Sequence, residues 1–310
     1  MEKFKQLKRI KEIYSKGENM IKYLKSIGQN KSNSIEDILI SYDFQAGSYI
    51  KAYFNNPSYK NDYCAALATI IDKYENIDSI IEVGVGEATT LNSLINKLEN
   101  RPKDIFGFDI SWSRVKFGKE FLKDFGHKDI KLFTANLFEI PLLDNSIDIV
   151  YTSHSIEPNG GKEEDALKEL YRISNKYLIL LEPSFEFGTK EAKQRMIEHG
   201  YVTKLYQTAR DLNYKIIEHR LFGHNSNILN PTGLLIIEKQ KNLQKIHSNL
   251  VCPMTHTSLQ KFNENLLYSE DSFLAYPIIE NIPCLLKENS ILAAHLNTKY
   301  EEYKTAHYNR

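Results

Sequence analysis

Residues 80–90 read I-I-E-V-G-V-G-E-A-T-T, an apolar run that turns through Gly84 and Gly86 into a segment with helical spacing. Glycines at such a turn let the backbone approach a ligand closely, and the following helix offers free N–H groups. A tight turn that binds nothing would use the same glycines. Its position makes it informative, because it opens a series in which strands and helices alternate.

The chain after residue 79 predicts a sheet protein. Continuous apolar strands that alternate with helices are typical of a parallel sheet covered on both faces. The last two strands follow each other without a helix, which predicts an antiparallel hairpin at the sheet edge. We therefore expect an α/β fold with a doubly wound, seven-stranded, mostly parallel, Rossmann-like sheet. The expected strands are 79–85, 104–110, 130–135, 147–152, 177–182, 214–222 and 232–239, and the expected helices are 89–99, 113–125, 162–175, 189–200 and 203–212.

The flanks differ from this central part. Residues 2–28 and 35–77 have helical, partly aromatic patterns, and Ser34 is placed to cap the second of these segments. After residue 240 come short strands and turns, and 289–306 resembles a terminal helix. We expect an N-terminal helical region at 1–78, the sheet domain at 79–240 and a small C-terminal α+β module at 245–310.

The composition excludes several classes of protein. The chain has 310 residues, 42% of them hydrophobic, and its 40 Lys and Arg balance its 40 Asp and Glu, which disfavours nucleic acid and anionic membranes as partners. Three scattered cysteines favour a reducing compartment. No apolar run approaches the length of a membrane span, so we expect a soluble, cytoplasmic protein without a membrane partner.

Two carboxylates beside the glycine turn indicate the ligand. Asp109 ends the second expected strand, where an acidic residue accepts hydrogen bonds from a ribose diol. A dinucleotide site would need a small residue where Thr89 stands, and its pyrophosphate would lie beside Glu82. Glu82 suits instead a ligand with an ammonium group, such as the methionine end of S-adenosylmethionine.

Three segments resemble motifs of the class I S-adenosylmethionine-dependent methyltransferases: E-V-G-V-G-E-A (82–88), F-D-I (108–110) and A-N-L-F-E-I-P-L-L-D-N-S-I-D-I-V (135–150). The resemblance covers roughly 79–240 and implies S-adenosyl-L-methionine as cofactor. Asn136 stands where that family often has Asp, and would hydrogen-bond the adenine amino group. The cofactor residues that the resemblance implies are Glu82, Gly84, Gly86, Asp109, Ile110, Asn136, Leu137 and Ser153.

The fourth expected strand runs into S-H-S-I-E-P-N-G-G (153–161). The carboxyl ends of parallel strands face the crevice where ligands bind, so this loop is expected where a methyl group would be transferred. His154 is a candidate general base or acceptor-orienting group. Glu157 is a second candidate catalytic residue, and Glu157 and Asn159 could hold a polar acceptor. A packed, hydrogen-bonded His154 at a strand end is the alternative.

The aromatic segment before the sheet supplies a candidate lid. Tyr42, Gln45 and Tyr49 are expected to contact the substrate, although tyrosines at helical spacing also fit a core. Glu182 and Ser184 end the fifth expected strand and could reach the crevice; a buried or capping role is the alternative.

The sequence leaves the methyl acceptor undetermined. Balanced charge and many tyrosines favour a small polar acceptor, such as a sugar or a biosynthetic intermediate, methylated on oxygen or nitrogen. The segment after 154 resembles bacterial methyltransferases of surface-glycan or natural-product pathways. The alternatives are a methyltransferase acting on tRNA, rRNA or protein, and a non-catalytic scaffold that retains the fold.

The C-terminal segment resembles a zinc-ribbon-like family that includes the small activator subunit of tRNA and protein methyltransferases. The resemblance rests on C-P-M-T (252–255), L-Y-S-E-D-S-F-L-A-Y-P-I (267–278) and N-I-P-C-L-L (281–286). One thiolate cannot make a structural zinc site, so we expect no metal. The module is expected to dock on the methyltransferase domain or to mediate homodimerisation. The four ligand places read Cys252, Thr255, Ser269 and Ser272.

Overall fold

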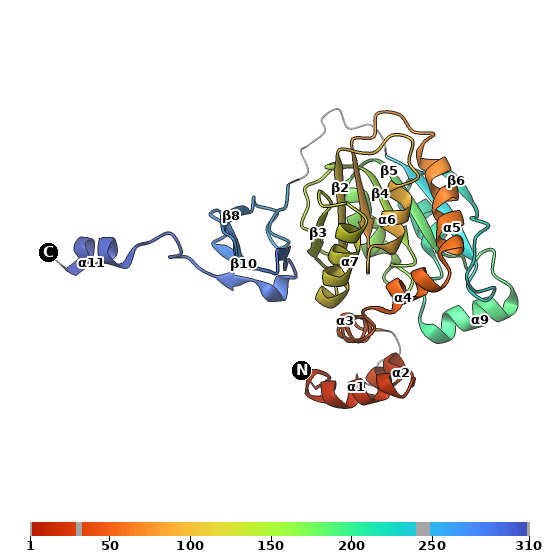
Figure 1. Cartoon of the computed structure of the whole chain (residues 1–310), viewed down its shortest axis with the longest axis horizontal. Coiled ribbons are helices and arrows are strands. Elements are labelled where there is room, and N and C mark those ends of the chain that lie inside the picture. Colours follow the sequence, from red (N-terminus) through yellow and green to blue (C-terminus); the bar gives the residue numbers. More distant parts are fainter. Residues whose placement is uncertain (1, 29–32, 240–248, 309–310) are drawn as a thin grey trace.

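Seven strands form the central sheet of the computed structural model, which describes residues 2–28, 33–239 and 249–308 (Figure 1). The strand order is β3-β2-β1-β4-β5-β7-β6. The first five strands are parallel, and β7 runs antiparallel to both β5 and β6, as the sequence predicts. The strands are β1 (Ser79–Val83), β2 (Asp104–Asp109), β3 (Lys131–Thr134), β4 (Ile147–Ser153), β5 (Ser174–Pro183), β6 (Lys215–Leu221) and β7 (Thr232–Glu238).

Helices cover both faces of this sheet because its central strands are apolar on both sides. Ile80 of β1 belongs to one buried cluster and its neighbour Ile81 to the other. The face of Ile80 packs against α5, α6 and α7, and the face of Ile81 against α8 and α10. The helices are α5 (Pro57–Ile71), α6 (Thr89–Ile95), α7 (Trp112–Asp124), α8 (Glu163–Ile173), α9 (Lys190–His199) and α10 (Leu205–Asp211).

The N-terminal helices have a small core of their own. Ser34 caps the third of them, as expected: its hydroxyl accepts from Asp37 N, while the Asp37 carboxylate accepts from Ser34 N. Lys3 pairs with the same buried carboxylate at 2.6 Å, so the first turn of the chain is tied to this cap. The elements are a 3₁₀ turn (Phe4–Gln6), α1 (Leu7–Ser15), α2 (Met20–Gly28), α3 (Ile35–Phe44) and α4 (Ser48–Asn55).

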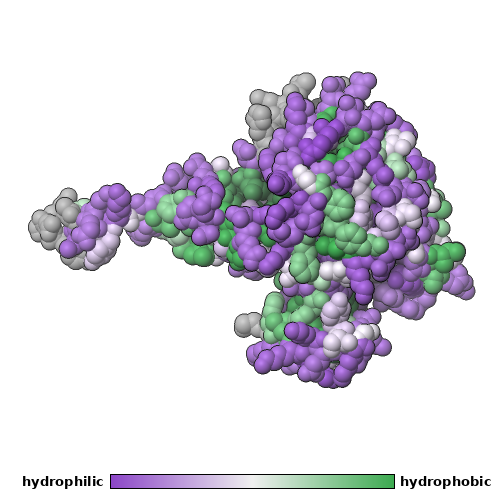
Figure 2. All heavy atoms as spheres, viewed as in Figure 1, coloured by the Kyte–Doolittle hydropathy of each residue, from purple (hydrophilic) through white to green (hydrophobic). Residues whose placement is uncertain are grey.

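The C-terminal module lies against the β3 edge of the sheet (Figure 1). Its Leu285 N donates to Thr134 O of β3, and Leu285 and Tyr276 belong to the same buried cluster as the sheet. Hydrophobic residues gather where the module meets the sheet domain (Figure 2). The module contains β8 (Gln260–Asn263), β9 (Leu266–Ser269), β10 (Leu274–Ile279), β11 (Ile282–Pro283), a 3₁₀ turn (Lys287–Asn289), β12 (Ile291–Leu292) and α11 (Tyr300–Tyr308).

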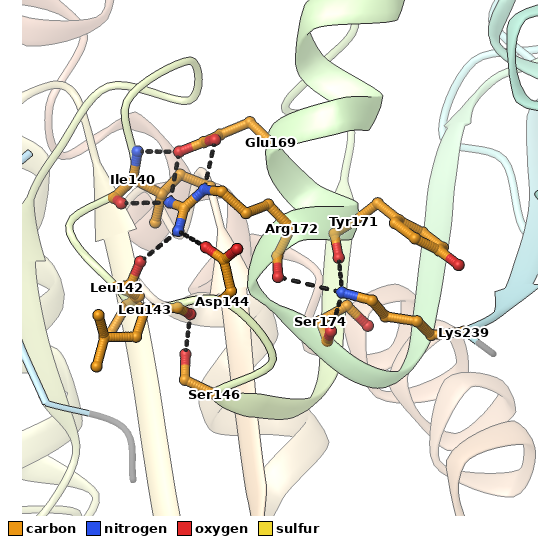
Figure 3. Close-up of polar contacts among 10 residues, drawn as sticks. All are labelled: Ile140, Leu142, Leu143, Asp144, Ser146, Glu169, Tyr171, Arg172, Ser174 and Lys239. Carbon is orange, nitrogen blue, oxygen red and sulfur yellow. Dashed lines mark hydrogen bonds and ion pairs between the residues drawn. The ribbon is translucent and has the colours of Figure 1, made fainter. Parts of the chain in front are cut away.

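A polar network braces the loop on which the module rests (Figure 3). Arg172 of α8 donates to the carbonyls of Ile140 and Leu142 and pairs with Glu169 and Asp144. Pro141, in the same loop, accepts from Val251 N of the module. Beside it, Lys239 donates to three carbonyls at the C-terminal end of α8 (Figure 3). This network therefore ties α8, the end of β7 and the start of the module together.

The C-terminal flank differs from the expected structure in one helix. The helix expected over 289–306 is wrong in its first part, because Ile291 and Leu292 pair with β10 as β12 and helix forms only over 300–308. The boundary expected at 240–245 lies outside the described residues. Among the helices of the described ranges, none combines the length and apolarity needed to cross a bilayer.

Candidate functional site

A hollow of about 730 Å³, counted with the part open to solvent, lies at the carboxyl ends of β1, β2, β3 and β4. We call it the central hollow. Parallel strands place their carboxyl ends at one edge, so residues far apart in sequence meet here. Its wall includes eleven of the residues proposed from the sequence, together with other residues of α3 and of the loop after β4. Those eleven are Tyr42, Tyr49, Gly84, Gly86, Asp109, Ile110, Asn136, Leu137, Ser153, His154 and Asn159.

The glycine turn is shaped by close contacts. Gly84 has a φ of +70°, and a Cβ on it would lie 2.2 Å from Cβ of Ser155. A side chain is therefore excluded there both by the backbone conformation and by the loop after β4. Gly86 has a φ of +53°, and its Cβ would lie 3.4 Å from the ring of Tyr49. The turn thus leaves bare backbone facing the hollow.

Asp109 occupies the expected place at the end of β2. Its Oδ2 accepts from Gly86 N at 3.1 Å and its Oδ1 accepts from Ser111 N at 2.9 Å. Burial raises the pKa of this carboxyl, while these N–H groups and the nearby Arg114 oppose the shift. Each oxygen keeps a further lone pair, so the carboxylate is fixed in position and can still accept from a ligand.

Glu82 lies deeper than the sequence suggests. It is 2% exposed, its Oε2 accepts from the Tyr151 hydroxyl at 2.9 Å, and it borders a second hollow rather than the central one. Burial raises its pKa to about 8, against the hydrogen bond from Tyr151. At neutral pH this carboxyl is therefore mostly protonated in the structure described here.

The loop after β4 is held by a carboxylate that the sequence analysis placed only loosely. Glu182, at the end of β5, accepts from the backbone N–H groups of Ser155, Ile156 and Glu157 at 3.0–3.1 Å. It is 3% exposed. Three charge-assisted hydrogen bonds to consecutive residues fix the path of the loop and hence the wall of the hollow. Of the two roles left open for Glu182, the structure shows the buried one.

His154 is tied at both ring nitrogens. Its Nδ1 lies 2.8 Å from Glu157 Oε2 and its Nε2 lies 2.8 Å from the Thr232 hydroxyl. The backbone of His154 has a φ of +57°, unusual for a residue other than glycine. Glu157 raises the pKa of His154 against the effect of burial. Asn230 donates to the same Glu157 oxygen, so the pair is part of a network behind the hollow.

The lid side chains surround a buried cation. Arg114 of α7 is 1% exposed, and its guanidinium lies 4.9 Å from the ring centre of Tyr42 and 4.2 Å from that of Tyr49. Its Nε donates to Tyr42 O, and its Nη1 lies 3.4 Å from the buried Glu87 carboxylate. Asp43 adds hydrogen bonds to the first turn of α7. The helices α3 and α4 are thus clamped over the glycine turn.

The remaining proposed residues are placed as follows. Ser153 borders both hollows and its hydroxyl lies 2.9 Å from that of Tyr63. Asn159 is buried and donates to Ile156 O. Glu157 faces His154 and Asn230 and borders neither hollow. Gln45 ends α3 and borders neither hollow, so the structure does not bring it to the site.

Three of the four places of the zinc-ribbon pattern are linked by hydroxyl groups. Thr257 bridges Thr255 and Ser269 at 2.8 and 2.7 Å, and the Ser269 hydroxyl accepts from Ser272 N. Cys252 lies 3.3 Å from the Tyr276 hydroxyl. Within residues 2–28, 33–239 and 249–308, no cluster of three or more His, Cys, Asp or Glu side chains is arranged to hold a metal ion.

Sequence reasoning missed Arg114 and the apolar wall made by Ile35, Ile38, Phe108 and Phe138. A basic residue in a helix normally faces solvent, and no local pattern tells that α3 and α4 fold over it. Phe138 directly follows Asn136 and Leu137, so its position next to two expected cofactor residues was the sequence signal that could have identified it.

One segment of the chain, which contains several residues of the site, matches a known protein family. Residues 80–176 match the family model described as a methyltransferase domain, and a comparison with curated proteins found no match. The match contains all three sequence segments that resemble methyltransferase motifs.

Solved structures with similar folds are distant in sequence. A SAM-dependent methyltransferase from Aquifex aeolicus is 14% identical, with 56% of this chain and 88% of that chain covered and a TM-score of 0.43. Magnesium protoporphyrin IX methyltransferase from Synechocystis, solved with bound SAH, is 11% identical, with 65% and 99% covered and a TM-score of 0.49. Geranyl diphosphate C-methyltransferase from Streptomyces coelicolor is 11% identical, with 56% and 77% covered and a TM-score of 0.45. Residues 80–176 of this chain are thus similar in sequence to a methyltransferase domain.

Proposed function

We propose that the protein is an S-adenosylmethionine-dependent methyltransferase that acts on oxygen or nitrogen of a small polar acceptor. One observation carries the proposal: the glycine turn, Asp109 and the loop of His154 converge on the central hollow, inside the segment that matches a methyltransferase domain. Fold alone would not support an activity, because one fold hosts many functions.

The residues of the central hollow fit the cofactor. Its wall combines apolar side chains with a few polar groups, as is usual for small-molecule sites. Asp109 would accept from the ribose hydroxyls, and Asn136 would meet the adenine edge between Ile110 and Leu137. Gly84 and Gly86 would let the backbone approach the methionine part. Glu82 borders the second hollow behind Gly84, so it would meet the ammonium group only where the methionine part enters that hollow, and it would give up its proton there.

His154 is the proposed base. When bound, S-adenosylmethionine supplies a methyl group on a cationic sulfur, so an acceptor hydroxyl or amine that is methylated gives up a proton. With Nδ1–H donating to Glu157, the neutral imidazole presents Nε2 as the proton acceptor. In that tautomer the Thr232 hydroxyl, 2.8 Å away, would donate to Nε2 and would have to release it. Glu157 would fix the tautomer, which makes it a positioning residue.

The proposal also covers the C-terminal module and the compartment in which the protein acts. We infer that residues 245–310 form a degenerate zinc-ribbon-like module beside an N-terminal region at 1–78 and a cofactor domain at 79–240. Its contacts with β3 favour docking on its own sheet domain over homodimerisation. The three cysteines are free and buried, which agrees with a cytoplasmic location.

The test is methyl transfer from S-adenosylmethionine with a ¹³C-labelled methyl group, read by mass spectrometry on panels of sugars, phenols and amines, with tRNA as a separate arm. We expect a small-molecule product. His154→Gln should lower kcat by about 10²–10⁴ and leave the affinity for S-adenosylhomocysteine unchanged, whereas His199→Gln, at an exposed helix end, should change neither. Methylation of tRNA alone would overturn the acceptor class, and cofactor binding without any product would favour a scaffold.

A further inference from the structure

A second hollow opens beside the central one. It measures about 1330 Å³, again including space open to solvent, and shares Tyr49, Gly84, Ser153 and His154 with the central hollow. The two therefore meet at the carboxyl ends of β1 and β4, where the proposed base stands. We call it the tyrosine hollow, because four tyrosines line it. Its full wall is Tyr49, Ala52, Tyr53, Asn56, Tyr59, Lys60, Tyr63, Glu82, Gly84, Val85, Thr89, Thr90, Ser153, His154, Asn225 and Ser226.

The tyrosines are held by the surrounding structure. Tyr63 is 3% exposed, and its hydroxyl lies 2.9 Å from the Ser153 hydroxyl at the end of β4. Tyr59 lies near Ser226, another residue of this wall, which opposes the rise in its pKa that burial causes. Tyr53 packs edge-on against Phe121 of α7. Fixed aromatic side chains provide apolar ring surface at low entropic cost, so this wall suits a ligand with a flat or ring-shaped body.

One cation reaches the tyrosine hollow without an ionic partner. Lys60 Nζ donates to the Thr90 hydroxyl at 2.9 Å and lies 5.5 Å from the ring centre of Tyr63. Lys60 makes no ion pair with any residue that the structure describes. A half-buried ammonium group held by one neutral hydroxyl retains two free donors, which a carboxylate or phosphate oxygen can accept.

Lys60 is the one Lys or Arg residue in this wall. Glu82 is the one Asp or Glu residue among the wall residues; burial raises its pKa to about 8, and the charge of Lys60 opposes that shift. His154 is hydrogen-bonded to Glu157, which lies behind the wall. Lys60 is therefore the fixed cation of the tyrosine hollow, and it lies beside the ring of Tyr63.

We propose that the tyrosine hollow is the acceptor site of the proposed methyltransferase, and that it takes an aromatic acceptor whose carboxylate or phosphate pairs with Lys60. The inference rests on the proposed function and narrows its acceptor class from polar to anionic. The nucleophilic oxygen or nitrogen would then lie at the opening between the two hollows, beside His154. An uncharged sugar would leave the ammonium group without a partner.

The test compares matched acids and amides. A fragment panel of monocyclic aromatic carboxylates, each with its carboxamide, is titrated by ligand-observed NMR against protein saturated with S-adenosylhomocysteine; 4-hydroxybenzoate and 4-hydroxybenzamide are the first pair. We expect the acids to bind about 10-fold or more tighter than their amides. Lys60→Met should abolish that preference, Lys60→Arg should retain part of it, and Lys51→Met on exposed α4 should leave it intact. Equal binding of acids and amides, binding of neither, or a preference that survives Lys60→Met would overturn the inference.

Two further titrations separate this inference from the cofactor. S-adenosylhomocysteine and its decarboxylated analogue are titrated into the wild type and Lys60→Met. We expect both to bind the variant as they bind the wild type. If Lys60→Met weakens only the carboxylate-bearing ligand, Lys60 serves the cofactor and the acceptor inference is overturned. Failure of the wild type to bind either ligand would instead overturn the proposed function itself.

Discussion

Replacement of Gly84 by alanine tests whether the glycine turn is packed as described. The new Cβ would meet Ser155 Cβ at 2.2 Å, while ordinary carbon contacts lie at about 3.5–4.0 Å, so Ser155 must move by more than about 1 Å. That movement would break the bond from Ser155 N to Glu182, worth roughly 1.5–3 kcal/mol. The φ of +70° adds roughly 1–2 kcal/mol for a residue with a Cβ.

Gly126→Ala is the matched control for this prediction. Gly126 has a φ of +87°, but a Cβ on it would meet nothing within 4 Å, so this change carries only the backbone cost. We expect urea unfolding to show a loss of about 2.5–5 kcal/mol for Gly84→Ala and about 1–2 kcal/mol for Gly126→Ala. Equal losses in the two variants would refute the close approach of the loop after β4.

Three further sets of variants test buried charged residues, and urea unfolding is the measurement for each set. Between pH 4.5 and 8, folded Glu82 holds a proton that the unfolded chain has lost, so the free energy of unfolding should fall as pH rises, by up to roughly 4 kcal/mol. Glu82→Gln should flatten this pH dependence. The same pH dependence in the wild type and the variant would contradict the burial of Glu82. Arg114→Met should cost about 3–5 kcal/mol by leaving Glu87 unpaired, and adding Glu87→Gln should recover part of it; additive losses would contradict the pairing. Glu182→Gln should cost about 2–4 kcal/mol and Glu186→Gln, next to an exposed loop, under about 1 kcal/mol; a small effect at Glu182 would mean that its three N–H bonds do not hold the loop.

The central sheet could be predicted because its signals are local. Each strand is a short apolar run between helices, and all seven expected ranges overlap the observed strands. The hairpin followed from the absence of a helix between 222 and 232. The helix expected at 289–306 was wrong because a helical pattern near 300 was extended over Ile291 and Leu292, whose partner strand lies some 17 residues away in sequence.

The site residues that lie at strand ends could be predicted from the sequence. Asp109, Asn136 and His154 were named from their positions, and the topology brings them to one edge. Arg114, Lys60 and the tyrosines of α5 were not assigned to the site, because their places there depend on how the N-terminal helices lie over the sheet. Such long-range packing has no periodic signature in the chain.

The binding of the cofactor product tests the account most directly. S-adenosylhomocysteine is titrated calorimetrically into the wild type, Asp109→Asn and Asp104→Asn; Asp104 begins the same strand at its opposite end. The account predicts binding with one site per chain, a loss of about 10-fold or more in Asp109→Asn, and no change in Asp104→Asn. Absence of binding in the folded wild type, or equal affinity in all three proteins, would contradict it.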